Sequence, residues 1–491
     1  MYWNKKDLQE VVRKRLSEYS FLVVSNREPY IHSYSGDSIE CSVPASGLTI
    51  ALDPIMQTCK GTWVAHGSGD ADKKVVDDRN RILVPPENPT YALRRVWLSK
   101  EEEDRYYSGF SNEALWPLCH IVYTRPKFDE EDWNTYKKVN ELFATAVLDE
   151  IGDKKAFIFI QDYHLALLSR LIKRGNKNVI TAQFWHIPWP NREAFRICPW
   201  QEEILDGLLG NDLIGFHIAY HRDNFIETVE RTLECKIDHE KHSITRSGQT
   251  TLVHPFPISV DFDQISKDAG KESVLQEMES LKQQYGLGDE IIGAGIDRID
   301  YTKGIPERLI ALDKLFSRYP NYRGKVVFFQ LSEPSRIHIK KYRELNAETD
   351  ELIETINWKY QREDWKPVIH LKEHLSPATL HAFRRMADFF IVSSLHDGMN
   401  LVAKEYVASR IDEDGVLILS RFTGAARELT EALLINPYAT DEFAETIREA
   451  IELSPPDRKK RMHKLREIVQ NNNIYRWAGK IATELSNIEM K

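Results

Sequence analysis

A strand–loop–helix unit at residues 389–409 limits the possible folds more than any other part of the sequence. The apolar run Phe389–Val392 predicts a buried parallel strand. The polar loop Ser393–Asn400 contains one glycine, and apolar residues at helical spacing begin at Leu401. A buried strand that leads through such a loop into a helix is typical of an α/β sheet.

The start of the helix at Leu401 predicts an anion site. The first helical N–H groups have no partner inside the helix, and the helix dipole adds roughly half a positive charge there. Asp397 lies at this mouth and is either a helix cap or a ligand for a hydroxylated substrate. Glu405, about one turn into the helix, suits sugar hydroxyls better than phosphate. The alternative interpretation is an ordinary capped helix.

Alternation of buried strands with helices continues along most of the chain and predicts parallel, doubly wound sheets. The expected strands are 21–25, 156–160, 179–185, 212–216, 290–296, 325–330, 368–371, 389–392 and 416–420. A chain of 491 residues is too long for one core, so we expect two domains. Ligands are then expected in a cleft between the carboxyl ends of the two sets of strands.

The segment Pro255–Asp261 contains two prolines, follows the polar stretch Cys235–Thr251 and predicts the boundary between the domains. We therefore expect an N-terminal domain at 1–255, a second domain at 256–470 and a last helical segment at 471–491.

Two polar segments of the first domain are expected to lie outside its core. Residues Glu28–Ser46 predict a loop, because they contain Gly36 and Pro44 and no clear hydrophobic period. The charged segment Asp70–Arg81 predicts a solvated excursion of the chain.

Composition excludes several classes of protein. A formal net charge of −9 without a long basic block argues against nucleic acid as a partner. The five cysteines are scattered, with no CxxC pair, which indicates reduced thiols and no zinc site. The N-terminus lacks the apolar core of a signal peptide, and no apolar run approaches the roughly 20 residues that span a membrane. We expect a cytoplasmic protein without a metal or a membrane partner; the sequence leaves homo-oligomerisation open.

Four cations follow predicted strands, at the edge where a sheet exposes polar groups. Arg298 and Lys303 lie in the loop that opens the second domain, Arg336 follows another strand, and Arg27 follows the first strand. Arginine can grip phosphate oxygens through two N–H groups, and lysine supplies a point charge. In a chain of net negative charge, these cations indicate one or two anionic ligands. The alternative for each is a surface ion pair, for Arg298 with an aspartate of its own loop.

Aromatic and polar side chains in the first domain suit a carbohydrate. Tyr107 and Trp116 lie among hydroxyl-bearing residues, although Trp116 is open to a second interpretation as a core residue. Asp162 and His186 each follow a buried strand, so their polar groups are expected at its carboxyl edge. A lone histidine at such a place is more often structural.

Nine short motifs occur in order along the chain. They are Ser25-Asn-Arg, Phe110-Ser-Asn-x-x-Leu-Trp-Pro, Gln161-Asp-Tyr-His-Leu, His186-Ile-Pro-Trp-Pro, Asp212-Leu-Ile-Gly-Phe-His, Arg298-Ile-Asp-Tyr-Thr-Lys-Gly, Pro334-Ser-Arg, Asp397-Gly-Met-Asn-Leu-Val-Ala-Lys-Glu-Tyr-Val and Asn436-Pro-Tyr. Together they resemble the trehalose-6-phosphate synthase family of retaining glycosyltransferases, over about residues 21–485. This resemblance implies a GT-B fold, in which two Rossmann-like, doubly wound parallel-sheet domains face each other across a cleft and the last helix returns to the first domain.

The resemblance also implies roles for individual residues. Those expected to bind the donor are Gly47, Arg298, Lys303, His374, Asp397, Gly398, Met399, Asn400, Leu401 and Glu405. Those expected to bind the acceptor are Arg27, Tyr107, Trp116, Asp162 and Arg336. The residues expected to take part in catalysis are Arg298, Lys303, Asp397 and His186, the last of them beside the anomeric centre.

The family's reaction is implied to proceed on one face of the sugar, without a protein nucleophile, a metal or a cofactor. The expected donor is a nucleotide-glucose, with UDP-glucose favoured, and the expected acceptor is glucose 6-phosphate, giving α,α-trehalose 6-phosphate. No haloacid-dehalogenase-like Asp-x-Asp motif follows the last helix, so we expect a separate enzyme to remove the phosphate.

Several positions depart from the family pattern. His396 replaces a usual arginine, Ser46 replaces a usual glycine, Trp185 and Trp189 flank the His-Ile-Pro motif, and the loop between Arg27 and the Gly47 region is longer than usual. These changes leave the donor base and the acceptor open. The alternatives are a glucosylglycerol-phosphate synthase, a pseudo-glycosyltransferase with an aminocyclitol phosphate, and a non-catalytic sugar-phosphate sensor.

Overall fold

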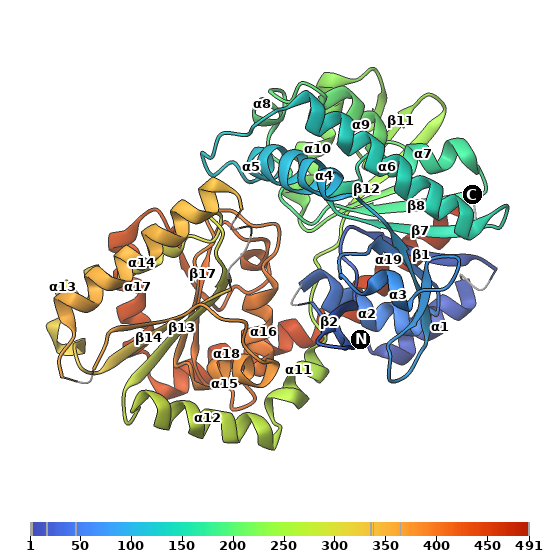
Figure 1. The fold of residues 1–491 in the computed structure, drawn as a ribbon. Helices are drawn as coiled ribbons and strands as arrows, with labels where there is room; N and C mark the ends of the chain where they lie inside the picture. Colours follow the sequence, from blue (N-terminus) through green and yellow to red (C-terminus); the bar gives the residue numbers. More distant parts are fainter. Residues whose placement is uncertain are drawn as a thin grey trace. The chain divides into compact units, whose positions relative to one another are not determined.

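The computed structural model describes residues 3–15, 18–44, 47–333, 336, 338–363 and 365–489. The chain divides into two compact units. Unit 1 comprises residues 1–258 and 474–491, and unit 2 comprises residues 259–473. Each unit contains a largely parallel sheet with helices packed against it, which confirms the predicted α/β class (Figure 1).

Unit 1 is built on a ten-stranded sheet and a separate two-stranded hairpin. Its strands are β1 (Ser20–Ser25), β2 (Ile31–Ser35), β3 (Ser38–Ser42), β4 (Thr62–His66), β5 (Arg81–Val84), β6 (Tyr91–Val96), β7 (Ala156–Gln161), β8 (Val179–Phe184), β9 (Leu213–Phe216), β10 (Lys236–Asp238), β11 (Ser243–Arg246) and β12 (Gln249–Pro255). The order in the large sheet is β10-β11-β12-β9-β8-β7-β1-β4-β6-β5. Neighbours from β12 to β6 run parallel, whereas β10, β11 and β5 pair antiparallel at the edges.

Helices cover both faces of this sheet (Figure 1). They are α1 (Lys5–Arg15), α2 (Gly47–Cys59), α3 (Asp72–Val75), α4 (Lys100–Glu103), the π-helix η1 (Asp104–Leu115), α5 (Trp116–His120), α6 (Glu130–Ile151), the 3₁₀ turn η2 (Tyr163–Leu165), α7 (Leu168–Gly175), α8 (Arg192–Phe195), α9 (Gln201–Leu208), α10 (Ala219–Thr232) and α19 (Ile474–Glu489). Helices α1, α2 and α19 pack against one another, as do α6, α7 and α9. Trp477 of α19 donates from Nε1 to the carbonyl oxygen of Phe256 at 3.1 Å, which ties this helix to unit 1.

The strand order of unit 1 reverses between β1 and β7. From β1 the chain proceeds to β4 and β6 on one side, and from β7 it proceeds to β8 and β9 on the other. The register aligns Val24 with Ile160, so the residues after Ser25 and after Gln161 leave the sheet at the same edge. In open α/β sheets ligands bind at such a reversal, outside the carboxyl ends of the strands.

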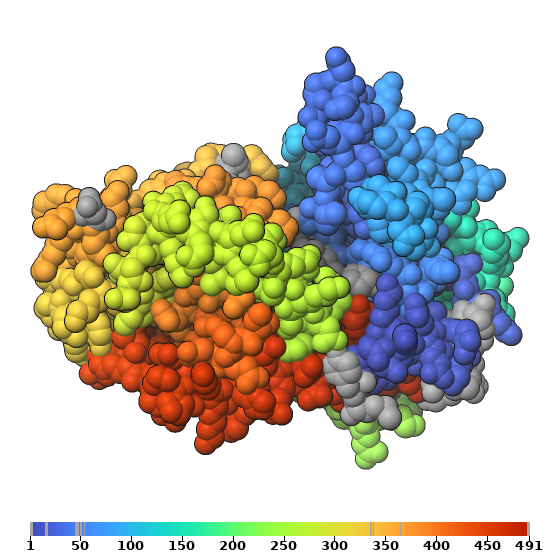
Figure 2. Space-filling view, turned by 90° about the horizontal axis from the view of Figure 1, so that it is seen from below, coloured from blue at the N-terminus to red at the C-terminus, as the bar shows by residue number. Residues whose placement is uncertain are grey.

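The segment expected as a loop at residues 28–46 contains the hairpin β2–β3, in which Tyr34 pairs with Ile39. Most side chains of the hairpin are exposed, and it forms the blue projection of unit 1 in Figure 2. The expectation failed because the hairpin is polar and packs little of its surface. The polar stretch Cys235–Thr251 likewise contains β10, β11 and the start of β12, which extend the sheet at an edge where water faces the strands.

The prediction that Asp70–Arg81 is solvated was wrong for Asp72. This residue begins α3, and its side chain is 0% exposed because Arg95 Nη2 lies 2.7 Å from Asp72 Oδ1. A buried carboxylate requires such a partner, and the partner comes from β6, which the local sequence does not reveal.

Unit 2 contains a six-stranded, fully parallel sheet in the order β15-β14-β13-β16-β17-β18. Its strands are β13 (Ile291–Arg298), β14 (Val326–Glu333), β15 (Val368–Leu371), β16 (Phe389–Val392), β17 (Val416–Ser420) and β18 (Leu433–Ile435). The order reverses between β13 and β16, so the loops after these two strands flank the crevice at which such a sheet binds ligands. The strand predicted at 389–392 is confirmed, and all four of its residues are buried.

The helices of unit 2 also form two groups (Figure 1). They are α11 (Phe262–Ala269), α12 (Glu272–Tyr285), α13 (Ile305–Arg318), the 3₁₀ turn η3 (Pro320–Tyr322), α14 (Lys340–Tyr360), α15 (Pro377–Met386), α16 (Leu401–Ser409), the 3₁₀ turn η4 (Gly424–Arg427), α17 (Thr440–Glu452) and α18 (Pro455–Asn471). Helix α13 packs against α14 and α17, whereas α16 packs against α11, α15 and α18. Across the described parts of both units, every helix is too short or too polar to cross a membrane.

Candidate active site

Two loops of unit 2 meet at the reversal of its strand order and are joined by backbone groups. Leu395 donates from its N–H to the carbonyl oxygen of Thr302 at 2.7 Å, and Ser393 Oγ donates to the carbonyl oxygen of Gly304 at 2.8 Å. Gly304 has a φ of +63°, and a Cβ there would lie 2.2 Å from the carbonyl oxygen of Ser393. Only glycine allows this approach, so the loop after β13 is fixed against the loop after β16.

Asp397 forms an ion pair across these loops. Its Oδ2 lies 2.6 Å from Lys303 Nζ, and the Asn400 amide donates to the same oxygen at 3.3 Å. Asn400, with a φ of 86°, caps α16 by accepting a hydrogen bond from the N–H of Ala403 at 3.0 Å. Asp397 is therefore not the N-cap of α16, because Asn400 occupies the cap position.

The backbone between Asp397 and α16 is held by η4. Ala425 donates from its N–H to the carbonyl oxygen of Met399 at 2.9 Å. A Cβ on Gly424 would lie 2.1 Å from the carbonyl oxygen of Gly398, so this contact also depends on glycine. The N-terminal N–H groups of α16, from Leu401 onward, are consequently presented from a fixed turn, as an anion site requires.

Arg298 and Arg336 both lie near one oxygen of a buried carboxylate. Asp300 Oδ2 is 3.7 Å from Arg298 Nη2 and 3.7 Å from Arg336 Nη1, and the Asp300 side chain is 0% exposed. Burial would raise the pKa of Asp300, but the two guanidinium groups, Lys303 and the Thr302 N–H together hold that pKa below its ordinary value. Asp300 is therefore ionised at neutral pH.

Two further donor-site predictions fall at the same edge of the unit 2 sheet. Glu405 of α16 is bound by Arg384 Nη2 of α15 and is largely buried. His374 follows β15, and its Nδ1 lies 3.1 Å from Glu333 Oε1 at the end of β14, with the ring largely exposed. Arg384 was missed by the sequence analysis, because its partner lies on a different helix.

In unit 1, Arg27 follows β1 at the reversal of strand order. Its Nη2 donates to the hydroxyl of Tyr107 at 3.0 Å. Two side-chain hydrogen bonds fix the backbone at the end of β1. Trp63 Nε1 donates to Ser25 Oγ at 2.8 Å, and Ser25 Oγ donates to the carbonyl oxygen of Arg27 at 2.6 Å. The structure thus brings together two residues that are 80 positions apart in the chain.

Asp162 and His186 meet at the ends of β7 and β8. Asp162 Oδ1 accepts a hydrogen bond from the N–H of His186 at 3.1 Å, and His186 Nε2 lies 2.9 Å from Gln161 Oε1. Asp162 has a φ of 69°, an uncommon conformation for a residue other than glycine. Burial lowers the pKa of His186 to about 3. This imidazole is therefore neutral at physiological pH and can donate or accept a hydrogen bond without carrying charge.

Tyr107 and Trp116 lie on and directly after the π-helix η1, an irregular turn that is often found at functional sites. The ring of Tyr107 stacks on His164 at 5.6 Å, and the ring of Trp116 lies 5.9 Å from that of Tyr163. Trp116 is 7% exposed, so it fits the core interpretation as well as the functional one.

The structure gathers the predicted residues into two sets. Arg27, Tyr107, Trp116, Asp162 and His186 belong to unit 1, whereas Arg298, Lys303, Arg336, His374, Asp397 and Glu405 belong to unit 2. Gly47 begins α2 in unit 1, and Ser46 beside it lies outside the described residues, as do Pro334 and Ser335 before Arg336.

The charges in unit 2 favour an anionic ligand. Three predicted cations (298, 303 and 336) lie with two carboxylates (300 and 397) at the edge where α16 begins. The cations and the N–H groups of α16 can bind phosphate oxygens, and a carboxylate can accept hydrogen bonds from sugar hydroxyls. In the part of the chain that the structure describes, no three His, Cys, Asp or Glu side chains gather in a way that could hold a metal ion.

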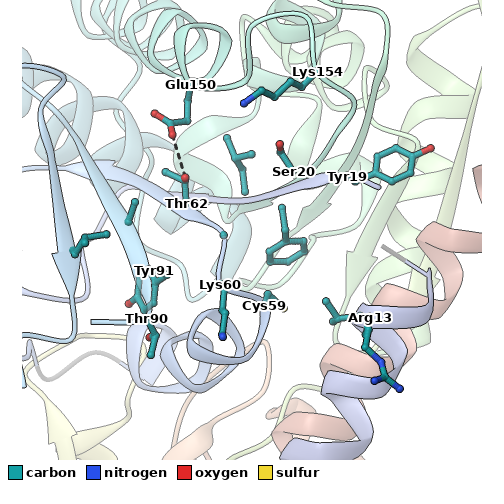
Figure 3. A pocket seen from close by; sticks show the side chains of 16 residues that line it. Arg13, Tyr19, Ser20, Cys59, Lys60, Thr62, Thr90, Tyr91, Glu150 and Lys154 are labelled. Carbon is teal, nitrogen blue, oxygen red and sulfur yellow. Dashed lines mark hydrogen bonds between the residues drawn. The ribbon is translucent and has the colours of Figure 1, made fainter. Parts of the chain in front are cut away.

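A hollow of about 530 Å³ in unit 1 lies apart from both sets (Figure 3). It is lined at the opposite, amino-terminal end of β1 by residues such as Ser20, Thr62, Tyr91, Glu150 and Lys154. Glu150 Oε1 accepts hydrogen bonds from Thr62 at 3.2 Å and from Arg81 at 3.1 Å. None of the predicted site residues lines this hollow.

Comparisons with known proteins agree with this arrangement. Glycosyltransferase family 20 matches residues 19–487. The bifunctional trehalose-6-phosphate synthase/phosphatase of Thermoproteus tenax is 35% identical over 469 residues, which are 93% of this chain and 62% of that protein, so the chain spans less than two thirds of this relative.

Two solved structures are similar over nearly their whole length. One is the E. coli trehalose-6-phosphate structure bound with UDP-2-fluoro glucose, with 30% identity and a TM-score of 0.84, covering 95% of this chain and 99% of that one. The other is the α,α-trehalose-phosphate synthase (UDP-forming) of Burkholderia xenovorans in complex with glucose-6-phosphate, with 27% identity, a TM-score of 0.84 and coverage of 95% and 99%. The resemblance and the GT-B fold class predicted from the sequence are confirmed, and the chain belongs to glycosyltransferase family 20.

Proposed function

We propose that this protein transfers glucose from UDP-glucose to glucose 6-phosphate with retention of configuration, giving α,α-trehalose 6-phosphate. Family membership supports the reaction class. The ligands named for the two similar solved structures, UDP-2-fluoro glucose and glucose-6-phosphate, support the choice of donor and acceptor.

In this proposal unit 2 binds the donor. Arg298, Lys303 and the N–H groups at the start of α16 hold the diphosphate, and Asp397 accepts hydrogen bonds from the donor sugar. Glu405, held by Arg384, accepts hydrogen bonds from the ribose hydroxyls. His374 lies beside the nucleotide, and Gly47 is the remaining residue that the proposal assigns to the donor.

The proposal assigns five residues to the acceptor. Arg27, Tyr107, Trp116 and Arg336 bind its phosphate, and Asp162 binds its sugar. The Arg27–Tyr107 hydrogen bond supports this assignment, because it orients a guanidinium that would otherwise have several rotamers.

The proposed chemistry needs no protein nucleophile. The bond between the anomeric carbon and the leaving phosphate oxygen breaks, the acceptor hydroxyl oxygen bonds to that carbon on the same face, and the hydroxyl proton passes to the leaving phosphate oxygen. Arg298, Lys303 and the helix N-terminus stabilise the charge that grows on the diphosphate. His186 stays neutral and can hydrogen-bond near the anomeric centre without competing for the proton.

One observation carries the proposal most strongly. The two loops at the strand-order reversal of unit 2 are fixed to each other by backbone contacts and hold Arg298, Lys303 and Asp397 beside the N-terminus of α16. That geometry suits a nucleotide diphosphate attached to a polyhydroxylated group better than a neutral ligand.

A product assay tests the proposal. UDP-, ADP- and GDP-glucose are each offered with glucose 6-phosphate or glycerol 3-phosphate, and nucleotide release, product mass and anomeric configuration by NMR are measured together. The expected result is a disaccharide phosphate from UDP-glucose and glucose 6-phosphate in which both anomeric carbons have the α configuration. Product from glycerol 3-phosphate alone would move the protein to a sister synthase, and donor binding without turnover would indicate a sensor.

The two proposed phosphate sites are separated by Arg298→Ala and Arg336→Ala. The first should lower kcat about 10²- to 10³-fold, because it removes stabilisation of the leaving group. The second should raise the KM for glucose 6-phosphate about 10- to 100-fold while sparing that for UDP-glucose, as expected for loss of a charged hydrogen bond. Arg318→Ala removes an exposed guanidinium of the same unit and serves as the control, with no expected change.

A further inference from the structure

The carboxylate of Asp300 has two oxygens with different surroundings. Oδ1 accepts hydrogen bonds from the N–H and the Oγ of Thr302, both at 3.0 Å. Oδ2 accepts no hydrogen bond from any described residue and instead faces Arg298 and Arg336, each at 3.7 Å. One oxygen therefore fixes the carboxylate on its loop, and the other faces two guanidinium groups.

These guanidinium groups come from different segments. Arg298 ends β13, whereas Arg336 follows β14 and donates from Nη1 to the hydroxyl of Tyr342 at 2.7 Å. Two guanidinium groups this close to one point would repel each other without an anion between them. Asp300, buried beneath both, supplies that anion.

We propose that Asp300 is the shared positioning residue for both substrates: it sets the separation between the arginine that faces the donor diphosphate and the arginine that faces the acceptor phosphate. This inference rests on the proposed function, which assigns Arg298 to the donor and Arg336 to the acceptor. It adds that the relative position of the two substrates within unit 2 is set by one carboxylate that touches neither of them.

The distances explain why one carboxylate can orient two arginines without disabling either. At 3.7 Å neither contact is a close charge-assisted hydrogen bond, which would be about 2.7–2.9 Å long. Arg298 and Arg336 are therefore held in position and keep their capacity to bind phosphate.

This arrangement predicts a particular kinetic signature for Asp300→Asn. The variant keeps the shape of the side chain and an oxygen for Thr302, but it turns an uncharged amide toward the two arginines. Loss of orientation should lower kcat about 10- to 100-fold, as small misplacements of bound groups do. Ground-state binding should change little, because the lost orientation is opposed by a gain in positive potential. The KM of each substrate is expected within about threefold of the wild-type value.

The test compares three variants with the wild type: Asp300→Asn, Thr302→Val and the charge-matched control Asp313→Asn. Asp313 lies on α13 and pairs with Lys359. Steady-state kinetics gives kcat and both KM values, and titration calorimetry gives the affinity for UDP. Thr302→Val is nearly isosteric and removes one hydrogen bond to Oδ1, so it should show the same kcat effect at a smaller size, about 3- to 10-fold. Asp313→Asn should behave as the wild type.

The outcomes separate this inference from the proposed function. If the wild type forms no disaccharide phosphate, the proposed function is contradicted. The UDP affinity then still tests the inference, because Asp300→Asn should bind UDP within about threefold of the wild type. A kcat within twofold of the wild type in both variants would overturn the inference, as would a tenfold weakening of UDP binding. If Asp300→Asn fails to fold, Thr302→Val decides on the same criteria.

Discussion

Each unit contains a fully buried arginine, Arg95 on β6 in unit 1 and Arg308 on α13 in unit 2, and the two arginines differ in the charges around them. In unit 2, Arg308 has one carboxylate: its Nη2 lies 2.6 Å from Asp297 Oδ2. Its other bonds go to neutral acceptors, with Nη1 at 2.9 Å from Gln330 Oε1 and Nε at 3.1 Å from Ser393 Oγ. This cluster is electrically balanced.

In unit 1, Arg95 serves two carboxylates. Its Nε donates to Glu28 Oε2 at 2.8 Å, and its Nη2 lies 2.7 Å from Asp72 Oδ1. The same Nη2 lies 2.8 Å from His32 Nδ1, and it donates to the carbonyl oxygen of Tyr30 at 3.0 Å. With both carboxylates ionised, this cluster carries a negative charge that burial opposes.

The consequence is a bound proton in unit 1. Burial, together with neighbouring Asp72 and despite Arg95, raises the pKa of Glu28 to about 8. Burial also raises the pKa of Asp297, but there Arg308 and Lys303 oppose the rise without a second close carboxylate of comparable effect. The comparison predicts that the stabilities of the two buried clusters depend differently on pH. The reason is that Arg95 contacts two carboxylates, whereas Arg308 contacts one.

Both clusters support residues of the proposed site. Arg308 joins the loop residue Ser393 to β13, and Gly295 is required beneath it, since a Cβ there would lie 2.2 Å from Arg308 Nη1. Glu28 directly follows Arg27, and it also accepts hydrogen bonds from the N–H and Oγ of Ser68, at 2.8 and 3.0 Å. A change in either cluster should therefore reach its half of the site.

The largest expected effect comes from removing each guanidinium. Arg95→Met and Arg308→Met each leave a buried carboxylate without its closest cation, so each should lower the free energy of unfolding by about 3–5 kcal/mol. Arg308→Met is expected at the lower end, because Lys303 still acts on Asp297. Hydrogen-exchange mass spectrometry measures the loss of protection in each unit separately.

Arg95→Lys and Arg308→Lys are the matched controls, since lysine keeps the charge but not the several bonds. Each lysine variant should lose less protection than its methionine counterpart. Equal losses for lysine and methionine would show that packing, not charge, sets the effect.

The sequence predicts several strands that are apolar and buried on both faces, such as the runs at 156–160 and 389–392, because such strands need only hydrophobic residues over four to eight positions. It misses β4, although four of the five residues of that strand are buried. It also fails for β10, β11 and the β2–β3 hairpin, whose mostly polar residues leave no hydrophobic period to detect, although Ser243 and Ile244 of β11 are buried.

The site divides in the same way. Residues that follow buried strands, such as Arg27, Asp162 and Arg298, could be placed at the correct sheet edge from the sequence. Their partners could not, because they lie far along the chain: Tyr107 is 80 residues from Arg27, and Arg95 is 67 residues from Glu28. Long-range ion pairs carry no local sequence signal.

An intermediate effect is expected from replacing one carboxylate in each cluster by its amide. Asp297→Asn removes the carboxylate that pairs with Arg308 and should cost unit 2 about 1.5–3 kcal/mol. Glu28→Gln leaves Asp72 with Arg95 and should cost unit 1 less than about 1 kcal/mol at pH 7, because Glu28 is already largely protonated there.

The same substitution should thus have unequal effects in the two units. Protection in each unit by hydrogen exchange measures both variants. Equal losses of protection in the two units would contradict this prediction, since they would mean that Glu28 is ionised and needed by Arg95 at pH 7.

The smallest effect concerns pH. Glu28 has an ordinary pKa of 4.5 when unfolded and about 8 when folded, so the folded state binds more protons between these values and the stability of unit 1 falls as pH rises through this window. Between pH 7 and pH 8 the loss should be about 1 kcal/mol. The groups nearest Glu28 do not obscure this interval: burial lowers the pKa of His32 below 6.5 and raises that of Cys41 above 9.0.

Tryptophan fluorescence during urea unfolding measures this change mainly in unit 1, because only Trp358 and Trp365 of the 11 tryptophans lie in unit 2. Glu28→Gln should abolish the loss between pH 7 and pH 8, whereas Asp297→Asn should leave it unchanged. If the wild type and Glu28→Gln lost equal stability in that interval, the proton would not reside on Glu28, and the contrast between the two buried arginines would lie in packing rather than in charge.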